Sequence, residues 1–498
     1  MDDEYRQRVR RHSPSSLLPL IAAAGARHGR PGEGLDSVLN SPYRKYTPWA
    51  LADAARVAVA EGTEFNRTDA TEGDLLAILA AHSSLKDPTL HGDGIDADRV
   101  RDFLLRTAGQ QFVYQLSEFG TWARTAALYL HTPFPEHRTP RILATGWEEE
   151  LLGCSLADYI SISNTLWASA VTCGGRFDLS LMDSPGGERV WDVVDRETTM
   201  RVLERHFSID PAEFKRADTA VRERMKGTPG TTSQMRQFTH NPLVARPALT
   251  GYGDSWLLCP VPQLVFRKAG PAGISFTGLQ HYGTDFNLET GYLFEEYVGR
   301  QLRLLRNAEV LPEIHYTVKR QVHHGVDWIV VFDDLVLLVE VKAAMPTERA
   351  GLGISYGLEE TARKIGKAYQ QISRTEELIA SGRPEFAAVP TDRPRHGLVV
   401  TLEPFHIVNA PLPMPNLTKP PIFTTVASAS ELEQLVCFTE DSPSKLLLER
   451  AADPQRSTWD LNAAFANREC APNPVLEEAW SILPWTQASR RANRTTGQ

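Results

Sequence analysis

The first half of the chain carries apolar residues at the three- and four-residue spacing that is typical of amphipathic helices. Thr47-Pro48 offers a helix cap and a first-turn proline before an alanine-rich run, so a helix is expected over residues 49–59. Thr71 and Asp74 have the spacing of a capping box ahead of the next apolar run. Further helices are expected at residues 96–130, after Ser155 and after Asp210-Pro211.

After residue 285 the pattern changes to short β-branched runs that alternate with helical segments, which is typical of a mixed α/β domain. The apolar run at residues 256–266 is interrupted by prolines and is expected to form an edge strand or a covering segment. Helices are expected over residues 288–306 and 358–381. Strands are expected at residues 314–319, 326–332, 335–343, 397–402 and 421–426.

These patterns divide the chain into four parts. Residues 1–226 are predicted to be a mostly helical domain that senses or binds a substrate or partner. Residues 227–286 form a linker and covering segment, because glycine, proline and small polar residues cluster at its start. Residues 287–430 form the mixed α/β domain, and residues 431–498 form a helical extension with a basic tail.

Composition narrows the class of protein. The chain has 498 residues, of which 42% are hydrophobic and 23% charged, as in ordinary globular proteins. A net charge of −9 argues against a generally basic nucleic-acid coat, although a local basic groove remains compatible with it. No apolar run approaches the roughly 18 residues of a bilayer span. The five scattered cysteines include no C-x-x-C pair, which suits a reducing cytoplasm, so we expect a cytoplasmic protein without a membrane partner.

One stretch places charged residues inside apolar strands. Two β-branched runs flank Asp333-Asp334, and aspartate tolerates the positive φ of a tight hairpin better than most residues. If these two residues form the loop, Asp327 lies directly opposite Glu340, with Cβ atoms about 4.5–5.5 Å apart. Lys342 emerges on the same face as Glu340, because strand side chains alternate. The sequence therefore predicts two carboxylates and an ammonium at the end of one hairpin.

Two carboxylates in facing positions of apolar strands are unfavourable for stability, so their presence suggests a function. Two opposed carboxylates repel each other, and charged residues in strands covered on both faces need partners. A divalent cation removes the repulsion, and hard oxygen ligands suit Mg²⁺. The competing interpretation is an ordinary solvated strand pair with a surface contact between Glu340 and Lys342.

The same residues resemble the PD-(D/E)xK nuclease superfamily, whose fold is that of restriction endonucleases. In that family an Asp on one strand and a Glu-x-Lys on the next bind Mg²⁺ and activate water. Asp327, Glu340 and Lys342 match these three positions. Val326 stands where the family usually has a proline. The resemblance implies a restriction-endonuclease-like mixed-sheet domain, preceded here by a mostly α-helical region.

The resemblance covers residues 287–403 and implies two further site residues. Family members carry a Glu in a Gly-x-x-Phe-Glu-like setting on a helix before the sheet. Glu295 fits that position, with Glu296 as its neighbouring alternative. Many members also place a Gln on the helix after the lysine strand, where Gln371 is the counterpart and Gln370 the alternative.

The resemblance also implies a mechanism. Asp327, Glu340 and the backbone carbonyl of Val341 would hold Mg²⁺, for which Mn²⁺ can substitute. Lys342 would orient the attacking water or stabilise negative charge, and Glu295 would complete the outer shell of the metal or hold a second ion. The reaction is in-line phosphodiester hydrolysis that leaves 5′-phosphate and 3′-hydroxyl ends.

The implied partner is nucleic acid, DNA in preference to RNA. Lys364, Lys367 and Arg374 on the following helix are candidate phosphate contacts, although interspersed glutamates fit a solvated face equally well. The large helical half suggests that a protein partner or a second copy of the chain controls access. By analogy, such architectures resemble endonuclease effectors of bacterial restriction or anti-phage defence.

Two other functions remain open. The chain could be a non-catalytic nucleic-acid-binding or assembly protein that retains the nuclease fold, although a relic commonly loses one of the Asp, Glu and Lys. It could also be an RNA-directed nuclease, because no motif reads the 2′-hydroxyl. His323-His324 is not expected to bind a metal as a pair, because adjacent strand residues point to opposite faces.

Overall fold

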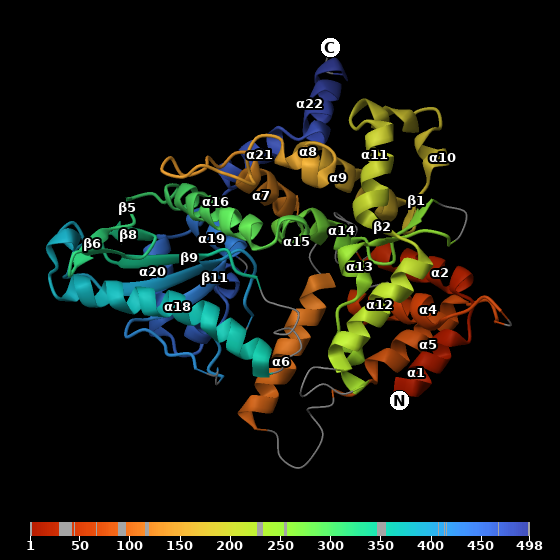
Figure 1. Ribbon diagram of the computed structural model, residues 1–498, viewed down its shortest axis with the longest axis horizontal. Helices are drawn as coiled ribbons and strands as arrows, with labels where there is room; N and C mark the ends of the chain where they lie inside the picture. The colour runs from red at the N-terminus through yellow and green to blue at the C-terminus, as the bar shows by residue number, and fades with distance from the viewer. Residues whose placement is uncertain are drawn as a thin grey trace.

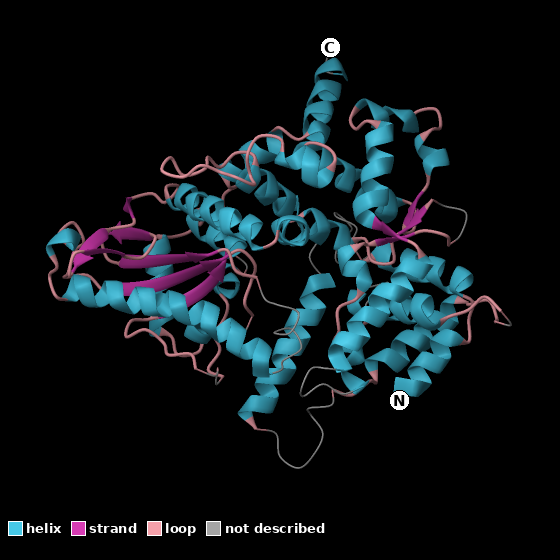
Figure 2. Cartoon of the chain, viewed as in Figure 1, coloured by secondary structure: helices cyan, strands magenta, loops and turns pink. Residues whose placement is uncertain are grey.

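The computed structural model describes residues 2–496 except 29–41, 44, 66, 88–95, 115–118, 227–232, 253–255, 346–354, 407, 413, 415 and 467. A mixed sheet lies on one side of the molecule and a helical bundle on the other (Figure 2). The predicted start of the linker, residues 227–232, lies outside the described residues. Among the described residues, no helix combines the length and the apolar character that a bilayer crossing requires.

The N-terminal bundle forms around its own hydrophobic core. It comprises α1 (Asp2–Arg10), α2 (Pro14–Arg27), α4 (Pro48–Glu61) and α5 (Glu72–Ser83), at the lower right of Figure 1. The predicted caps are confirmed. The Thr47 hydroxyl accepts the N–H of Ala50, and Thr71 and Asp74 form the reciprocal capping box.

The following helices match the expected positions. The predicted 96–130 segment divides into two helices, and Ser155 caps the helix predicted after it. The elements are α6 (Ala97–Gln111), α7 (Phe119–Tyr129), α8 (Trp147–Leu152), α9 (Leu156–Thr172), α10 (Leu179–Met182), α11 (Arg196–Val202) and α12 (Pro211–Lys226).

The prediction of an edge strand or covering segment at residues 256–266 is only partly right, because the strand found there lies between two others in a small sheet and not at its edge. A two-residue strand there is followed by a helix that begins after Pro262, because proline is well tolerated at a helix start. The small sheet has the order β1 (Arg176–Phe177), β4 (Leu257–Leu258), β3 (Ala248–Leu249), β2 (Ser208–Ile209). The helices around it are α13 (Pro242–Ala245), α14 (Gln263–Ala269) and α15 (Pro271–Tyr282).

The larger sheet is mixed, as the sequence predicts. Its order is β11 (Thr424–Ser428), β10 (Arg395–Thr401), β9 (Val336–Lys342), β8 (Trp328–Phe332), β5 (Ala308–Pro312). The first three strands run parallel, whereas β8 is antiparallel to both of its neighbours. A separate hairpin of β6 (His315–Val318) and β7 (Gln321–His324) lies next to it (Figure 1).

Helices cover both faces of this sheet, which explains its nearly continuous apolar strands. On one face, Leu338 and Val399 pack with Ile372 of α18 (Ser355–Ala380). On the other, Val339 and Trp328 pack with α16 (Thr284–Leu302) and α19 (Ala429–Val436). The C-terminal helices are α20 (Pro443–Ala452), α21 (Pro474–Ser481) and α22 (Pro484–Thr496).

A buried ion pair joins the helical half to the sheet-bearing half. The Arg124 guanidinium on α7 donates to both carboxylate oxygens of Glu433 on α19, at 2.5 and 2.7 Å. The Tyr297 hydroxyl of α16 donates to the same carboxylate at 2.5 Å. Arg124 and Glu433 are both buried, so each charge depends on the other for its compensation.

Replacing Arg124 by alanine is expected to lower the free energy of unfolding by about 3–5 kcal/mol, because Glu433 would remain as an unpaired buried charge. Urea denaturation followed by circular dichroism measures this change. The matched control is Arg8→Ala, which breaks an exposed pair with Glu4 and is expected to cost less than about 1 kcal/mol. Equal effects of the two substitutions would contradict the structural role of the buried pair.

Candidate active site

The β8–β9 hairpin has the predicted register. Phe332 donates its N–H to the carbonyl of Leu335 at 2.8 Å, so Asp333-Asp334 form the two-residue loop. Trp328 pairs with Val339, which places Asp327, immediately before β8, level with Glu340. The reason differs from the prediction, however, because neither loop aspartate is among the described non-glycine residues with positive φ.

Asp327, Glu340 and Lys342 lie together at the end of this hairpin. Lys342 Nζ donates to Glu340 Oε1 at 2.5 Å. Asp327 Oδ2 accepts the backbone N–H of Val341 at 2.6 Å. Glu340 is only 4% exposed, and its Oε2 has no hydrogen-bond partner among the described residues. The hairpin therefore joins the three predicted side chains and leaves one buried carboxylate oxygen unsatisfied.

Helix α16 brings Glu295 to this group. The Trp328 indole N–H donates to the carbonyl of Glu295 at 3.1 Å, which ties the helix to the start of β8. Gly299, one turn later, permits this approach, because a Cβ there would lie 2.2 Å from the Trp328 ring. The charge of Asp327 acts on Glu295, which places this glutamate within electrostatic reach of the hairpin site.

Burial and neighbouring charges raise the pKa values of the acidic groups. Burial, followed by the charge of Asp327, raises the pKa of Glu295 to about 7. Burial raises the pKa of Asp327, and burial together with Asp327 raises the pKa of Glu340. Although burial opposes its charge, the facing carboxylates raise the pKa of Lys342. Three carboxyl groups here thus release their protons less readily than exposed ones.

The donor set fits a hard divalent cation. Asp327 and Glu340 offer carboxylate oxygens from facing positions of the hairpin, and among the described residues no group donates a hydrogen bond to the buried Oε2 of Glu340. Glu295 and the backbone carbonyl of Val341 are further oxygen ligands of the predicted set. Oxygen donors of this kind suit Mg²⁺ or Mn²⁺, and a cation would offset the mutual repulsion of the carboxylates.

Gln371 supports the segment that leads into the site. Its side-chain amide donates to the carbonyls of His324, at 2.8 Å, and Gly325, at 2.5 Å. Both carbonyls precede Asp327 in the chain. The alternative, Gln370, is exposed. Gln371 is therefore a positioning residue that holds the backbone before Asp327.

Replacing Gln371 by alanine is expected to reduce the Mg²⁺-dependent activity that the family resemblance implies about 10–100-fold, the usual effect of losing a residue that orients a metal ligand. The weaker metal binding should shift the Mg²⁺ concentration needed for half-maximal activity to higher values. Gln370→Ala serves as the control and should leave that concentration unchanged. A uniform loss in both variants would indicate a general effect on α18 instead.

The three candidate phosphate contacts share one face of α18. Lys367 is exposed, whereas Lys364 Nζ lies 3.5 Å from a carboxylate oxygen of Glu360. The Arg374 guanidinium lies over the Tyr316 ring, 5.3 Å from its centroid. This is also the face from which Gln371 reaches the site. A role for these residues in nucleic-acid binding stays a prediction.

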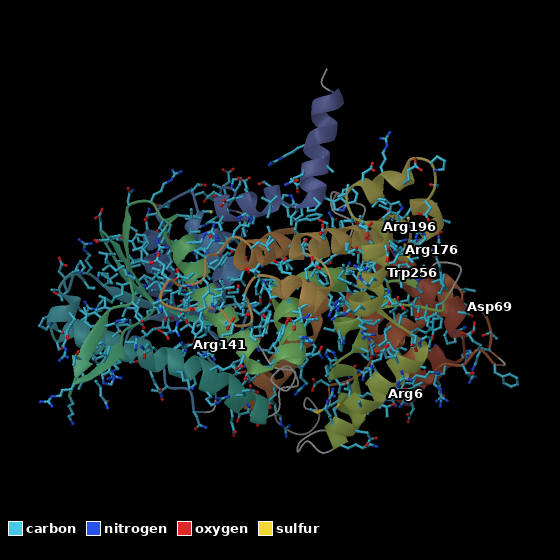
Figure 3. The ribbon with its side chains drawn as sticks, turned by 45° about the horizontal axis from the view of Figure 1, so that its top comes forward. Arg6, Asp69, Arg141, Arg176, Arg196 and Trp256 are labelled. Atoms are coloured by element: carbon cyan, nitrogen blue, oxygen red, sulfur yellow. The ribbon has the colours of Figure 1, made fainter. Side chains whose placement is uncertain are left out.

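Two charged residues that act on the site, Arg138 and Glu313, were not predicted from the sequence. Arg138, from the helical half, lies over the Tyr292 ring at 3.9 Å, and its charge acts on Glu295. The neighbouring Arg141, labelled in Figure 3 on the side that carries α16, donates its backbone N–H to Glu289 of that helix at 2.8 Å. Glu313 also acts on Asp327 and Glu295. Hydrophobic patterns and short motifs do not reveal contacts between segments that lie far apart in the chain, such as the contact of Arg138 with α16.

No protein-family model, no curated protein and no solved structure matches this chain.

Proposed function

We propose that this protein is a Mg²⁺-dependent nuclease with a restriction-endonuclease-like domain that hydrolyses phosphodiester bonds in DNA. The observation that carries the proposal is the placement of Glu340. This buried carboxylate has an oxygen without a hydrogen-bond partner among the described residues. It lies level with Asp327, which immediately precedes the facing strand, and Lys342 is hydrogen-bonded beside it. The resemblance of these residues to the PD-(D/E)xK pattern supports the same function.

A purely structural ion pair between Glu340 and Lys342 explains fewer features of the site than a metal site does. One ammonium can balance one carboxylate, but Asp327 and Glu295 add two more within electrostatic reach. Like charges that repel in a buried place destabilise the fold, so their assembly indicates a function. A bound cation balances all of these charges together.

Each residue has a distinct task in the proposed reaction. When bound, Mg²⁺ supplies a Lewis acid that lowers the pKa of a bound water and offsets phosphate charge. Asp327 and Glu340 hold the ion, and the N–H of Val341 orients the Asp327 carboxylate. Lys342 places an ammonium where it can orient water or stabilise the negative charge that develops on the phosphate.

The experiment that tests the proposal uses the purified full chain with supercoiled DNA, linear DNA and RNA, each with Mg²⁺, Mn²⁺ or EDTA. Metal-dependent DNA cleavage that Lys342→Ala abolishes would support it. Lys445→Ala, at an exposed pair with Asp441, is the matched control. Cleavage of RNA but not of DNA would show that RNA, and not DNA, is the substrate. Binding of DNA without cleavage under every condition, including added cell lysate, would favour an assembly protein.

We also propose that the protein acts as an endonuclease effector in bacterial restriction or anti-phage defence. The large helical half and the acidic net charge support control of the nuclease by a partner or by that half. Plating efficiency of phages on bacteria that express the wild type or Asp327→Asn tests this role. Equal plating on both strains across a varied phage panel would contradict it.

A further inference from the structure

The β6–β7 hairpin brings two histidines and a glutamate together beside the candidate active site. His315 on β6 pairs directly with His324 on β7. The turn residues Lys319 and Arg320 have φ values of 48° and 67°, which provide the twist of a tight two-residue hairpin. Glu313 precedes β6 and contacts both imidazole rings.

The three side chains present their ligand atoms to a common point. Glu313 Oε2 lies 3.0 Å from His315 Nε2 and 2.9 Å from His324 Nδ1. All three ligand atoms lie within 4.8 Å of one another. Tetrahedral zinc with bonds of about 2.0–2.1 Å separates neighbouring donors by roughly 3.4 Å. Small side-chain rotations would therefore bring the donors to coordination distance.

We propose that Glu313, His315 and His324 form a binding site for a divalent transition-metal ion of the Zn²⁺ class. Two imidazole nitrogens and one carboxylate are a zinc donor set that leaves a fourth position for water. Imidazole is a poor ligand for Mg²⁺, so this site and the oxygen-lined site select different ions. The side chains are 33–58% exposed, which gives an ion direct access from solvent.

The ion would also act on the neighbouring site through the backbone. His324 offers its carbonyl to Gln371, and Asp327 follows shortly after it in the chain. Fixing the His324 ring to β6 would hold the start of the segment that leads into β8, where Gln371 also binds. This inference does not depend on the proposed nuclease activity, because Zn²⁺ binding is measured directly.

The test measures Zn²⁺ binding to chelator-treated full-length protein by isothermal titration calorimetry. Glu340→Gln is the background, because it removes the central ligand of the oxygen-lined site. We expect this background to bind one equivalent of Zn²⁺, and bound Co²⁺ to give visible absorption. Adding His324→Ala or His315→Ala should weaken Zn²⁺ binding at least about a hundredfold. Circular dichroism verifies that each variant is folded.

The matched control is His323→Ala. His323 is the adjacent residue, but its ring stacks on Tyr316 on the opposite face of the hairpin, so Zn²⁺ binding should be unchanged. Undiminished binding in both His324→Ala and His315→Ala would place the ion elsewhere and overturn the proposal. Absence of Zn²⁺ binding to the Glu340→Gln background at micromolar concentrations would show that the triad is only a hydrogen-bonded cluster. DNA cleavage by the wild type is scored separately and does not decide either outcome.

Discussion

Asp327→Asn is expected to reduce the rate of Mg²⁺-dependent DNA cleavage about a thousandfold, which corresponds to about 4 kcal/mol. The substitution removes one of the two facing negative charges that would hold the proposed metal ion. It keeps an oxygen that can accept the N–H of Val341, so the hairpin should fold as in the wild type. Single-turnover cleavage of linear DNA at saturating protein measures the effect.

The control for this prediction is Asp333→Asn in the same hairpin. Asp333 lies in the exposed loop, away from the metal ligands, and its replacement should leave the cleavage rate within about twofold of the wild type. Thermal melts of both variants establish that the fold is intact. If Asp327→Asn cleaves DNA at the wild-type rate, the acidic cluster has no part in the mechanism.

Metal affinity is expected to fall about 10–100-fold when the pH is lowered from about 8.5 to about 6. The pKa of Glu295 is about 7, and those of Asp327 and Glu340 are also raised, so protons compete with the ion over this range. Calorimetric titration with Mn²⁺ in buffers of different ionisation enthalpy measures both the affinity and the protons released. A flat affinity across this range would contradict ligation by these carboxylates.

The same pKa shifts predict the stability of the metal-free protein. A carboxyl whose pKa is raised in the folded state stabilises that state below its unfolded value, near 4.5 for Glu340. This contribution is lost as the pH rises through the folded-state pKa. The melting temperature should therefore fall as the pH rises from about 5 to 8.5, and Glu340→Gln should flatten that decline.

The sequence predicts correctly those helices and strands whose caps or turns involve residues close together in the chain. The Thr47 cap and the Thr71 capping box lie within one helical turn of the groups they satisfy, so they mark α4 and α5 correctly. The placement of Asp327 opposite Glu340 depends only on the length of the two-residue loop and on the alternation of side chains along each strand. Both are short-range properties, which explains why the core of the candidate site is predictable.

The sequence does not predict strands β5 and β7, because their own residues do not indicate which strand each of them pairs with. β5 ends at Pro312 and lies at the edge of the sheet, where apolar alternation is weak. β7 follows the Lys319-Arg320 turn, which lacks the glycine or asparagine that usually marks such a hairpin.

One part of the prediction for the histidines is confirmed by the structure. His323 and His324 do point to opposite faces, as expected from the strand period. The ligand partner of His324 is His315 across the hairpin, which becomes visible only once the β6–β7 register is known. Recognising the turn would have placed the two imidazoles side by side.

The hydrophobic interior that includes Trp122 and Phe177 from the helical half continues without a break to Val339 and Leu398 of the large sheet. The part of the chain that shares this interior, from α7 onward, should melt in a single calorimetric transition, whereas the N-terminal bundle has a core of its own. Any molecule that binds α7 or α9 would then change the melting temperature of the sheet as well. Excision of the sheet-bearing segment should yield an insoluble fragment, because the cut would expose the apolar side chains that α7 and α14 now cover.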